Sequence, residues 1–244
     1  MPKKLLITEK PSVAMEFSKA LKQNIVRKNG YLESEDWIIT WCVGHLVTMS
    51  YPEVYDENLK FWRLDTLPFL PKEYKYEIIP AVKNQFEIVQ SLLQREDIEE
   101  IYNAGDSGRE GEYIQRLVFM MANPNPNAKM KRVWIDSQTE DEIQRGIKEA
   151  KDMSEYDSLS DSAYLRAKED YLIGINFSRL LSIIYGRRLA KEINEERTED
   201  LVKQTSDALL KVMEKNYNQM LKERERARLN RRGNYTTIEQ IDSI

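Results

Sequence analysis

The stretch of this 244-residue sequence with the greatest chemical potential is acidic and reads Asp106-Ser107-Gly108-Arg109-Glu110-Gly111-Glu112. Carboxylates this close repel one another unless a cation joins them, and a hard divalent ion such as Mg²⁺ takes oxygen ligands. The same residues also suit the start of a helix, because Ser107 and Glu110 have the spacing of a capping box and acidic side chains stabilise a helix N-terminus. The residue types alone leave both a metal site and a helix cap open.

A second stretch of interest is Thr8-Glu9-Lys10-Pro11-Ser12. If both stretches follow neighbouring parallel strands, Glu9 can face Asp106 and Glu110 at one edge of the sheet. Lys10 can then hold a phosphate group. The simpler alternative is an ordinary helix start, in which Pro11 ends the strand and Ser12 precedes the helix.

Composition limits the chemistry further. The single cysteine, Cys42, and the single histidine, His45, exclude an internal disulfide, a cysteine-cluster metal site and a His-rich metal centre. A divalent metal must therefore sit on carboxylates, which favours magnesium over zinc. The net charge of -4 gives no overall attraction to nucleic acid, so such binding has to come from local patches. With no membrane-length apolar run and no signal-peptide pattern, we expect a cytoplasmic protein with no membrane partner.

The elements that must position these stretches follow from the hydrophobic pattern. Strand-like runs at 4–8, 37–43, 98–104 and 132–135 alternate with helix-like segments at 12–21, 82–93, 110–121 and 139–150. This alternation predicts an α/β fold with a parallel sheet. Residues 51–80 carry several prolines and aromatic residues and predict an irregular insertion. From Ser160 on, the pattern is helical.

Taken together, Glu9-Lys10-Pro11-Ser12 and the acidic stretch from Asp106 to Glu112 resemble the Toprim domain of type IA DNA topoisomerases, especially the bacterial topoisomerase III branch. Supporting matches in the family's order are Gly44-His45-Leu46, Asp136-Ser137-Gln138-Thr139, and the block from Ala163 to Arg179. The resemblance covers roughly residues 3–188. It implies a Toprim-type parallel α/β sheet flanked by helices over 1–152, followed by an all-helical C-terminal part. In that part, 153–190 would begin the family's helical DNA-binding domain, and 191–244 is a charged helical tail that matches nothing in the family.

The resemblance also implies roles for individual residues. Glu9 would be the general acid that protonates the leaving 3′ oxygen, and the base on resealing, while Lys10 would stabilise charge on the scissile phosphate. Glu9, Asp106 and Glu110 would hold Mg²⁺. DNA, single-stranded in particular, is the implied partner, contacted by Lys10, Arg109, Arg166 and Arg179.

Two departures from the family pattern matter. The family usually has a second aspartate where this sequence has Gly108, which removes one metal ligand, and Glu112 is the candidate to compensate. The family's nucleophilic tyrosine lies in a Tyr-x-Arg-Thr-like setting, and Tyr185-Gly186-Arg187-Arg188 lacks the threonine.

Three functions remain open. The first is a truncated type IA topoisomerase whose Toprim part supplies the Mg²⁺-binding acidic site for strand cleavage and religation. It would be active only within a longer chain or beside a separate chain that carries the tyrosine domain. The second is a catalytically inactive DNA- or partner-binding module. A Toprim nuclease or primase is the third and weaker, because the Glu-Lys-Pro-Ser stretch argues against it.

Other notable residues have structural explanations. We expect His45 to make a structural hydrogen bond rather than act in catalysis. Four aromatic residues in the insertion, Tyr51, Tyr55, Phe61 and Trp62, are expected to form a small satellite core rather than to stack on bases. The basic run from Leu221 to Arg232 suits a nucleic-acid-binding, solvated or partner-binding helix.

Overall fold

A computed structural model describes residues 2–185 and, in the tail, positions 203–204, 206–207, 210–211, 214–215, 218 and 222. The chain divides into two compact units. The first consists of Met1–Ser50 and Tyr74–Tyr164, and the second of Tyr51–Glu73 and Leu165–Ile244. Each unit is therefore built from two separate segments of the chain. None of the described helices is long and apolar enough to cross a membrane.

The described part of the first unit is built on a seven-stranded sheet with the order β2-β3-β4-β1-β7-β8-β9. The strands are β1 (Lys3–Thr8), β2 (Val26–Arg27), β3 (Tyr31–Glu33), β4 (Trp37–Trp41), β7 (Ile98–Ala104), β8 (Lys129–Arg132) and β9 (Lys151–Asp152). The four central strands run parallel, with β1 between β4 and β7 and with β8 beyond β7. The outer strands β2, β3 and β9 pair antiparallel. A separate hairpin joins β5 (Val47–Met49) to β6 (Tyr76–Ile78).

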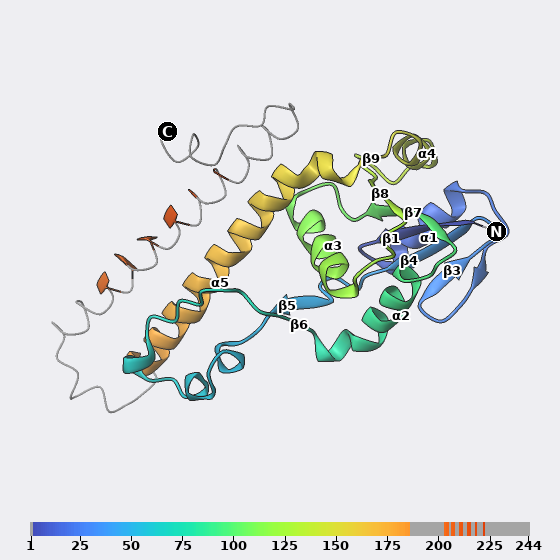
Figure 1. Ribbon diagram of the computed structural model, residues 1–244. Coiled ribbons are helices and arrows are strands. Elements are labelled where there is room, and N and C mark those ends of the chain that lie inside the picture. The colour runs from blue at the N-terminus through green and yellow to red at the C-terminus, as the bar shows by residue number, and fades with distance from the viewer. Residues whose placement is uncertain are drawn as a thin grey trace. The chain divides into compact units, whose positions relative to one another are not determined.

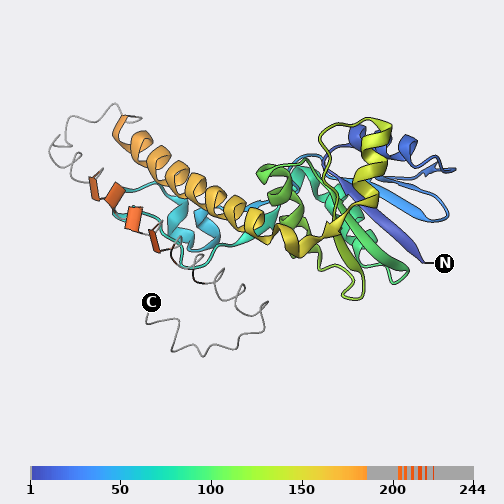
Figure 2. The ribbon, with the colours of Figure 1, turned by 90° about the horizontal axis from the view of Figure 1, so that it is seen from above.

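Helices cover both faces of this sheet (Figures 1 and 2). They are α1 (Pro11–Ala20), α2 (Lys83–Leu93), α3 (Arg109–Ala122) and α4 (Glu140–Lys148), and the 3₁₀ turns are η4 (Pro80–Val82) and η5 (Met153–Tyr156). On one face Phe17 of α1 and Ile143 of α4 share a core with Leu6 and Ile39 of the sheet. Because both faces are covered, Leu5, Leu6 and Ile7 are all fully buried, as is typical of a central parallel strand.

The second unit packs an irregular segment against a helix. Residues 51–73 contain the 3₁₀ turns η1 (Pro52–Val54), η2 (Glu57–Lys60) and η3 (Leu64–Thr66), and α5 (Asp157–Tyr185) supplies the helix from residue 165 on. Asn176 of α5 is buried and holds Phe69 at both backbone groups: it accepts from the amide N at 2.6 Å and donates to the carbonyl O at 2.9 Å. This side chain therefore replaces the backbone partners that an irregular segment lacks.

The fold predicted from the sequence is confirmed: a parallel α/β sheet flanked by helices precedes a helical part. The pattern missed β6, which lies in the segment predicted to be irregular, and the short outer strands. The domain boundaries at 152 and 190 stay predictions. Most of the charged tail at 191–244, including the basic run from Leu221 to Arg232, lies outside the described residues.

A polar cluster marks the beginning of the central strands. Glu100 of β7 accepts a hydrogen bond from the Tyr102 hydroxyl at 2.8 Å on Oε2, which also lies 3.4 Å from Lys4 Nζ, and its Oε1 accepts from Lys131. Burial raises the pKa of Glu100, but the hydrogen bonds from Lys131 and Tyr102 and the charges of both lysines outweigh this effect and lower the pKa from its ordinary 4.5 to about 2. The ionised carboxylate therefore stabilises the sheet.

The first prediction concerns this carboxylate. Because the pKa of Glu100 is lower in the folded than in the unfolded chain, its contribution is full above about pH 4.5 and is lost as the pH falls toward 2. We expect Glu100→Gln to lower the free energy of unfolding at pH 7 by about 1–3 kcal/mol, with a smaller loss near pH 3. Urea unfolding between pH 7 and 3 measures this effect. Glu99→Gln, at an exposed position of the same strand, is the control, and equal losses for both variants at pH 7 would contradict the assignment.

Candidate acidic site at the carboxyl edge of the sheet

The parallel pairing of the central strands places both chemically interesting stretches at one edge of the sheet. Thr8, the last residue of β1, lies opposite Trp41 of β4 and Ala104 of β7. Glu9 and Asp106 follow directly in the loops that lead to α1 and α3. The carboxyl ends of parallel strands are where open α/β sheets bind ligands.

Glu9 and Asp106 are joined by a lysine. Lys10 Nζ lies 3.1 Å from Glu9 Oε1 and 3.8 Å from Asp106 Oδ2. The Glu9 side chain is only 10% exposed, whereas those of Lys10 and Asp106 are each 54% exposed. The hydrogen bond with Glu9 and the charges of both carboxylates raise the pKa of Lys10. The arrangement presents a cation and a carboxylate to solvent above a mostly buried carboxylate.

Glu110 points to a different partner. Its Oε1 lies 2.6 Å from Nε2 of His45, in the loop after β4, and its side chain is 73% exposed. The His45 ring also meets the Tyr113 ring edge-on, with centroids 6.1 Å apart. His45 thus makes a hydrogen bond, as expected, but to one of the expected metal ligands, and that its role is structural stays a prediction.

The expected convergence of three carboxylates is accordingly found only in part. Glu9 and Asp106 share Lys10, while Glu110 is held by His45. Within the part of the chain that the structure describes, no three His, Cys, Asp or Glu side chains are grouped so that they could hold a metal ion. The physical reason is that each carboxylate has a cationic or hydrogen-bonding partner, which relieves the repulsion between the carboxylates.

As a donor set, these residues nevertheless suit magnesium in kind. Asp106 and Glu110 carry exposed carboxylate oxygens four residues apart at the start of α3. Hard oxygen donors match Mg²⁺, and Mg²⁺ is usually held by one or two carboxylates with waters completing its shell. Gly108 between them contributes no side-chain ligand.

The backbone around Asp106 is fixed by close packing against α3. A Cβ atom on Gly111 would lie 2.2 Å from the Asp106 carbonyl O, and one on Gly105 would lie 2.8 Å from Gln115 Cγ. Ser107 ties the loop that contains Asp106 to the segment after β8. Its Oγ donates to the Ile135 carbonyl O at 2.7 Å and accepts from the Ile135 amide N at 3.1 Å. Only glycine at 111 permits this close approach.

Glu112, the residue expected to compensate for Gly108, is not available to a ligand. Its side chain is fully buried, and it accepts from Arg132 Nε at 2.8 Å and from Arg116 Nε at 2.7 Å. Burial lowers the pKa of Arg132, and the charge and hydrogen bond of Glu112 oppose that effect. This correction follows from a pairing that sequence reasoning missed. The strand predicted at 132–135 is instead β8, which ends at Arg132. The available signal was an arginine directly before the apolar Val133-Trp134-Ile135, where a buried charge requires a partner.

The arginines assigned to DNA differ in position. Arg109 begins α3 and is exposed, and Arg166 is exposed with its Nε 3.5 Å from Asp170 Oδ2. Arg179 is instead only 4% exposed: it donates to the Leu59 carbonyl O at 2.6 Å and lies over the Trp62 ring at 5.5 Å. The prediction of a DNA contact is therefore corrected for Arg179, because its guanidinium group is used inside the second unit.

The aromatic residues of the insertion also divide into two kinds. Tyr55 packs edge-on against buried Phe69, with ring centroids 5.1 Å apart, which agrees with the expected satellite core. Tyr51, Phe61 and Trp62 are 58%, 65% and 46% exposed and contribute little to it. The motif beginning at Tyr185 continues into residues outside the described range.

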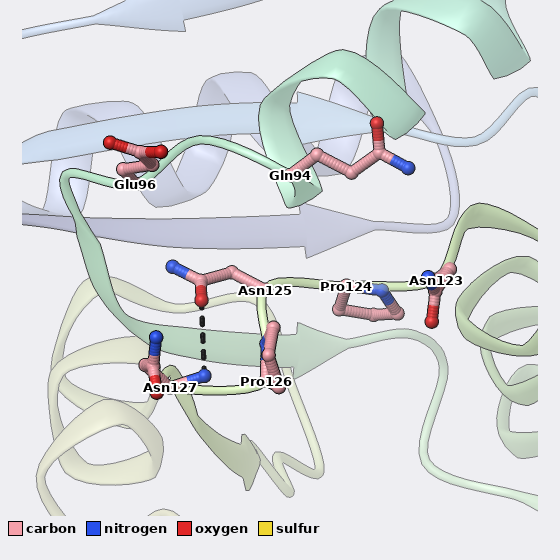
Figure 3. Close-up of a pocket in the computed structure, with 7 residues that line it drawn as sticks. All are labelled: Gln94, Glu96, Asn123, Pro124, Asn125, Pro126 and Asn127. Atoms are coloured by element: carbon pink, nitrogen blue, oxygen red, sulfur yellow. Dashed lines mark hydrogen bonds between the residues drawn. The ribbon is translucent and has the colours of Figure 1, made fainter.

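A hollow of about 500 Å³ lies at the opposite end of β7 from Asp106 (Figure 3). Its lining consists of Gln94, Glu96, Asn123, Pro124, Asn125, Pro126 and Asn127. Asn125 is used locally, since it accepts from the Asn127 amide N at 3.0 Å and donates to the Arg95 carbonyl O at 3.1 Å. This hollow is therefore separate from the acidic site.

Comparison with known proteins agrees with this geometry. Residues 4–137 match the Toprim domain family, and the chain belongs to that family. It is 41% identical to DNA topoisomerase 3 of Staphylococcus aureus (strain MRSA252) over 189 residues, which cover 77% of this chain and 26% of that protein. It is also 39% identical to DNA topoisomerase 3 of Staphylococcus epidermidis (strain ATCC 12228 / FDA PCI 1200) over 209 residues, or 85% and 29% of the two chains.

The matched part is thus a Toprim region of the topoisomerase 3 kind, as the sequence resemblance indicated. The chain spans only about a quarter of the length of the curated relatives it matches.

The second prediction uses two glycines of the same loop. Gly111→Ala places a methyl group 2.2 Å from the Asp106 carbonyl O, so we expect the free energy of unfolding to fall by about 1–3 kcal/mol as the loop is displaced. Gly108→Ala meets no atom within 4 Å, and its extended backbone tolerates alanine, so it should cost less than about 1 kcal/mol. Thermal and urea unfolding of both variants measure the difference. A Gly108→Ala loss equal to that of Gly111→Ala would contradict the close-packing argument.

Proposed function

We propose that this chain supplies the acidic Toprim part of type IA DNA topoisomerase chemistry, acting on single-stranded DNA with Mg²⁺. The observation that carries the proposal is the contact of Glu9, Lys10 and Asp106 at the carboxyl edge of a Toprim sheet. The first 152 residues form the Toprim domain of this proposal, and 153–190 begin a helical DNA-binding domain. The charged tail at 191–244 has no assigned role.

Each side chain has a task that its surroundings support. Glu9 is mostly buried at this edge beside Lys10, and the proposal assigns it proton exchange with the 3′ oxygen of a DNA strand. Lys10 is half exposed and can turn its ammonium group from Asp106 to a phosphate oxygen. Asp106 and Glu110, with Glu9 behind them, would hold Mg²⁺, which supplies charge neutralisation of the phosphate. Arg109 and Arg166 are exposed and can contact phosphates.

The nucleophile has to come from elsewhere, because the sequence contains no Tyr-x-Arg-Thr-like motif. The proposal therefore requires a tyrosine domain, supplied either within a longer chain or by a separate chain, and the cytoplasm is the proposed location.

A second candidate is a DNA- or partner-binding module without catalysis. It is favoured by Gly108, which provides no ligand, and by the separation of Glu110 from the other two carboxylates through His45. Magnesium binding distinguishes the two candidates.

The third prediction is that the chain binds Mg²⁺ weakly and through Asp106. Calorimetric titration should show that Asp106→Asn lowers the affinity about tenfold or more, since a charged oxygen ligand is lost. Gly108→Asp should raise the affinity, because a Cβ added at this position meets no neighbouring atom within 4 Å and the variant adds a carboxylate. Glu99→Gln removes an exposed carboxylate from β7 outside the acidic site and is the control for total charge. Equal affinities of the unaltered chain and Asp106→Asn would favour the binding module.

The fourth prediction concerns DNA. We expect the 244-residue chain to bind oligothymidylate and to leave supercoiled plasmid unrelaxed with Mg²⁺ present. Fluorescence anisotropy at several salt concentrations should show binding that weakens steeply with salt. Lys10→Ala should reduce the slope of log affinity against log salt by about 0.7, the value for one phosphate contact on a single strand.

Lys129→Ala is the matched control, because Lys129 is an exposed lysine at the beginning of β8, the strand end opposite to the acidic site. An identical change in slope for both lysines would mean that Lys10 makes no specific contact. A DNA adduct that survives denaturant would show that this chain contains the nucleophile.

A further inference from the structure

Arg132 is the largest fully buried side chain of the protein's described part, and it lies beneath the acidic loop. Its Nη1 donates to the Gly105 carbonyl O at 2.7 Å and its Nη2 to the Asp106 carbonyl O at 2.7 Å. Further bonds run from Nη1 to the carbonyl oxygens of Val133 at 2.8 Å and Asn103 at 3.3 Å. The guanidinium group therefore binds the backbone of the two residues that lead into the acidic loop.

The planar fork of an arginine is needed for this arrangement. Arginine presents five N–H donors in fixed directions, while lysine has one compact ammonium group with three. Arg132 uses its Nε for Glu112 at 2.8 Å and its two terminal nitrogens for the loop. Lysine at this position could keep the ion pair with Glu112 but could not also reach both loop carbonyls.

Glu112 braces this arginine from α3. Both of its oxygens are bonded, one to Arg132 and the other to Arg116 Nε at 2.7 Å. Arg116 donates to the Met153 carbonyl O at 2.7 Å and lies 3.1 Å from Asp157, so its other contacts lead away from the acidic loop. The two arginines thus share one carboxylate, but only Arg132 holds the loop.

The Asp106 carbonyl is constrained from three directions. The carbonyl oxygen accepts hydrogen bonds from Arg132 and from the Gly108 amide N at 2.9 Å. It also packs so closely against Gly111 that a Cβ atom there would clash with it. Fixing this carbonyl fixes the peptide plane after Asp106, and with it the direction in which the Asp106 side chain leaves the backbone.

We infer that Arg132, braced by Glu112, is a positioning residue that turns the Gly105 and Asp106 carbonyls into the protein so that the Asp106 carboxylate is presented at the carboxyl edge. The metal-binding consequence of this inference rests on the proposed function, whereas the structural consequence does not. Outer partners of ligand groups typically change metal affinity 10- to 100-fold when they are lost.

The test compares Arg132→Lys with Arg116→Lys in the full chain. Both variants keep the charge and the shared partner Glu112, but only the first loses the loop carbonyls. Hydrogen exchange of the metal-free protein is the first readout: the Gly108 amide, which donates to the Asp106 carbonyl, should exchange at least about tenfold faster in Arg132→Lys and unchanged in Arg116→Lys. Mg²⁺ titration is the second readout, with an expected loss of about tenfold for Arg132→Lys and less than about twofold for Arg116→Lys.

If Arg132→Lys does not fold, the double variant Arg132→Met with Glu112→Met removes both members of the buried pair, and Arg116, which loses Glu112, keeps the Met153 carbonyl O and Asp157 as partners. It should fold and show the same fast exchange at Gly108. Equal exchange of Gly108 in the unaltered chain and in the folded variants overturns the inference, as does an equal rise in both lysine variants. Faster exchange in Arg132→Lys with no Mg²⁺ binding by the unaltered chain upholds the positioning of the loop and overturns the metal site of the proposed function instead.

Discussion

The register of β1 between β4 and β7 is the constraint on which the acidic site depends. Glu9 and Asp106 are far apart in sequence and meet because Thr8 lies level with Ala104. Apolar alternation alone does not set this register, since Leu5, Leu6 and Ile7 are all buried. A polar contact between the two strands helps to set it, because Lys4 of β1 pairs with Glu100 of β7 near the start of both strands. A slip by one residue would pull a charged side chain into the core, which is costly.

At the edge itself, like charges are separated by giving each carboxylate a different partner. Glu9 and Asp106 share a lysine, Glu110 has a histidine, and Glu112 lies between two arginines below the surface. Of these four carboxylates, Asp106 and Glu110 are exposed, Glu9 is mostly buried and Glu112 is fully buried. The acidic stretch therefore has two parts. Asp106 and Glu110 are exposed carboxylates suited to a cation, and Glu112 forms a buried ion pair with Arg132 beneath them.

Much of this arrangement was predictable. Both stretches were placed correctly at strand ends, because apolar runs followed by turn residues indicate such junctions. The buried position of Glu112 was not predictable from spacing, since helix periodicity does not say which acidic residue of the first turns faces inward. The inward direction of Arg179 depends on a carbonyl 120 residues away in sequence, at Leu59, and no local pattern indicates that contact. Strand β6 was not predictable from its local pattern, because its partner β5 lies on the other side of a long insertion.

That insertion leaves and re-enters the first unit at adjoining points. Met49 lies opposite Tyr76 in the β5–β6 hairpin, and the Ser50 amide donates to the Lys75 carbonyl O at 2.8 Å. Residues 51–73 are therefore an excursion from the hairpin, and a change in the length of this excursion would leave the strand pairing unchanged. Their own contacts are with α5, through Asn176 and Arg179. A gene encoding this chain could thus lengthen, shorten or exchange the excursion without disturbing the Toprim sheet. Cutting the chain before α5 would instead remove Asn176 and Arg179, which hold Phe69 and Leu59 of the excursion.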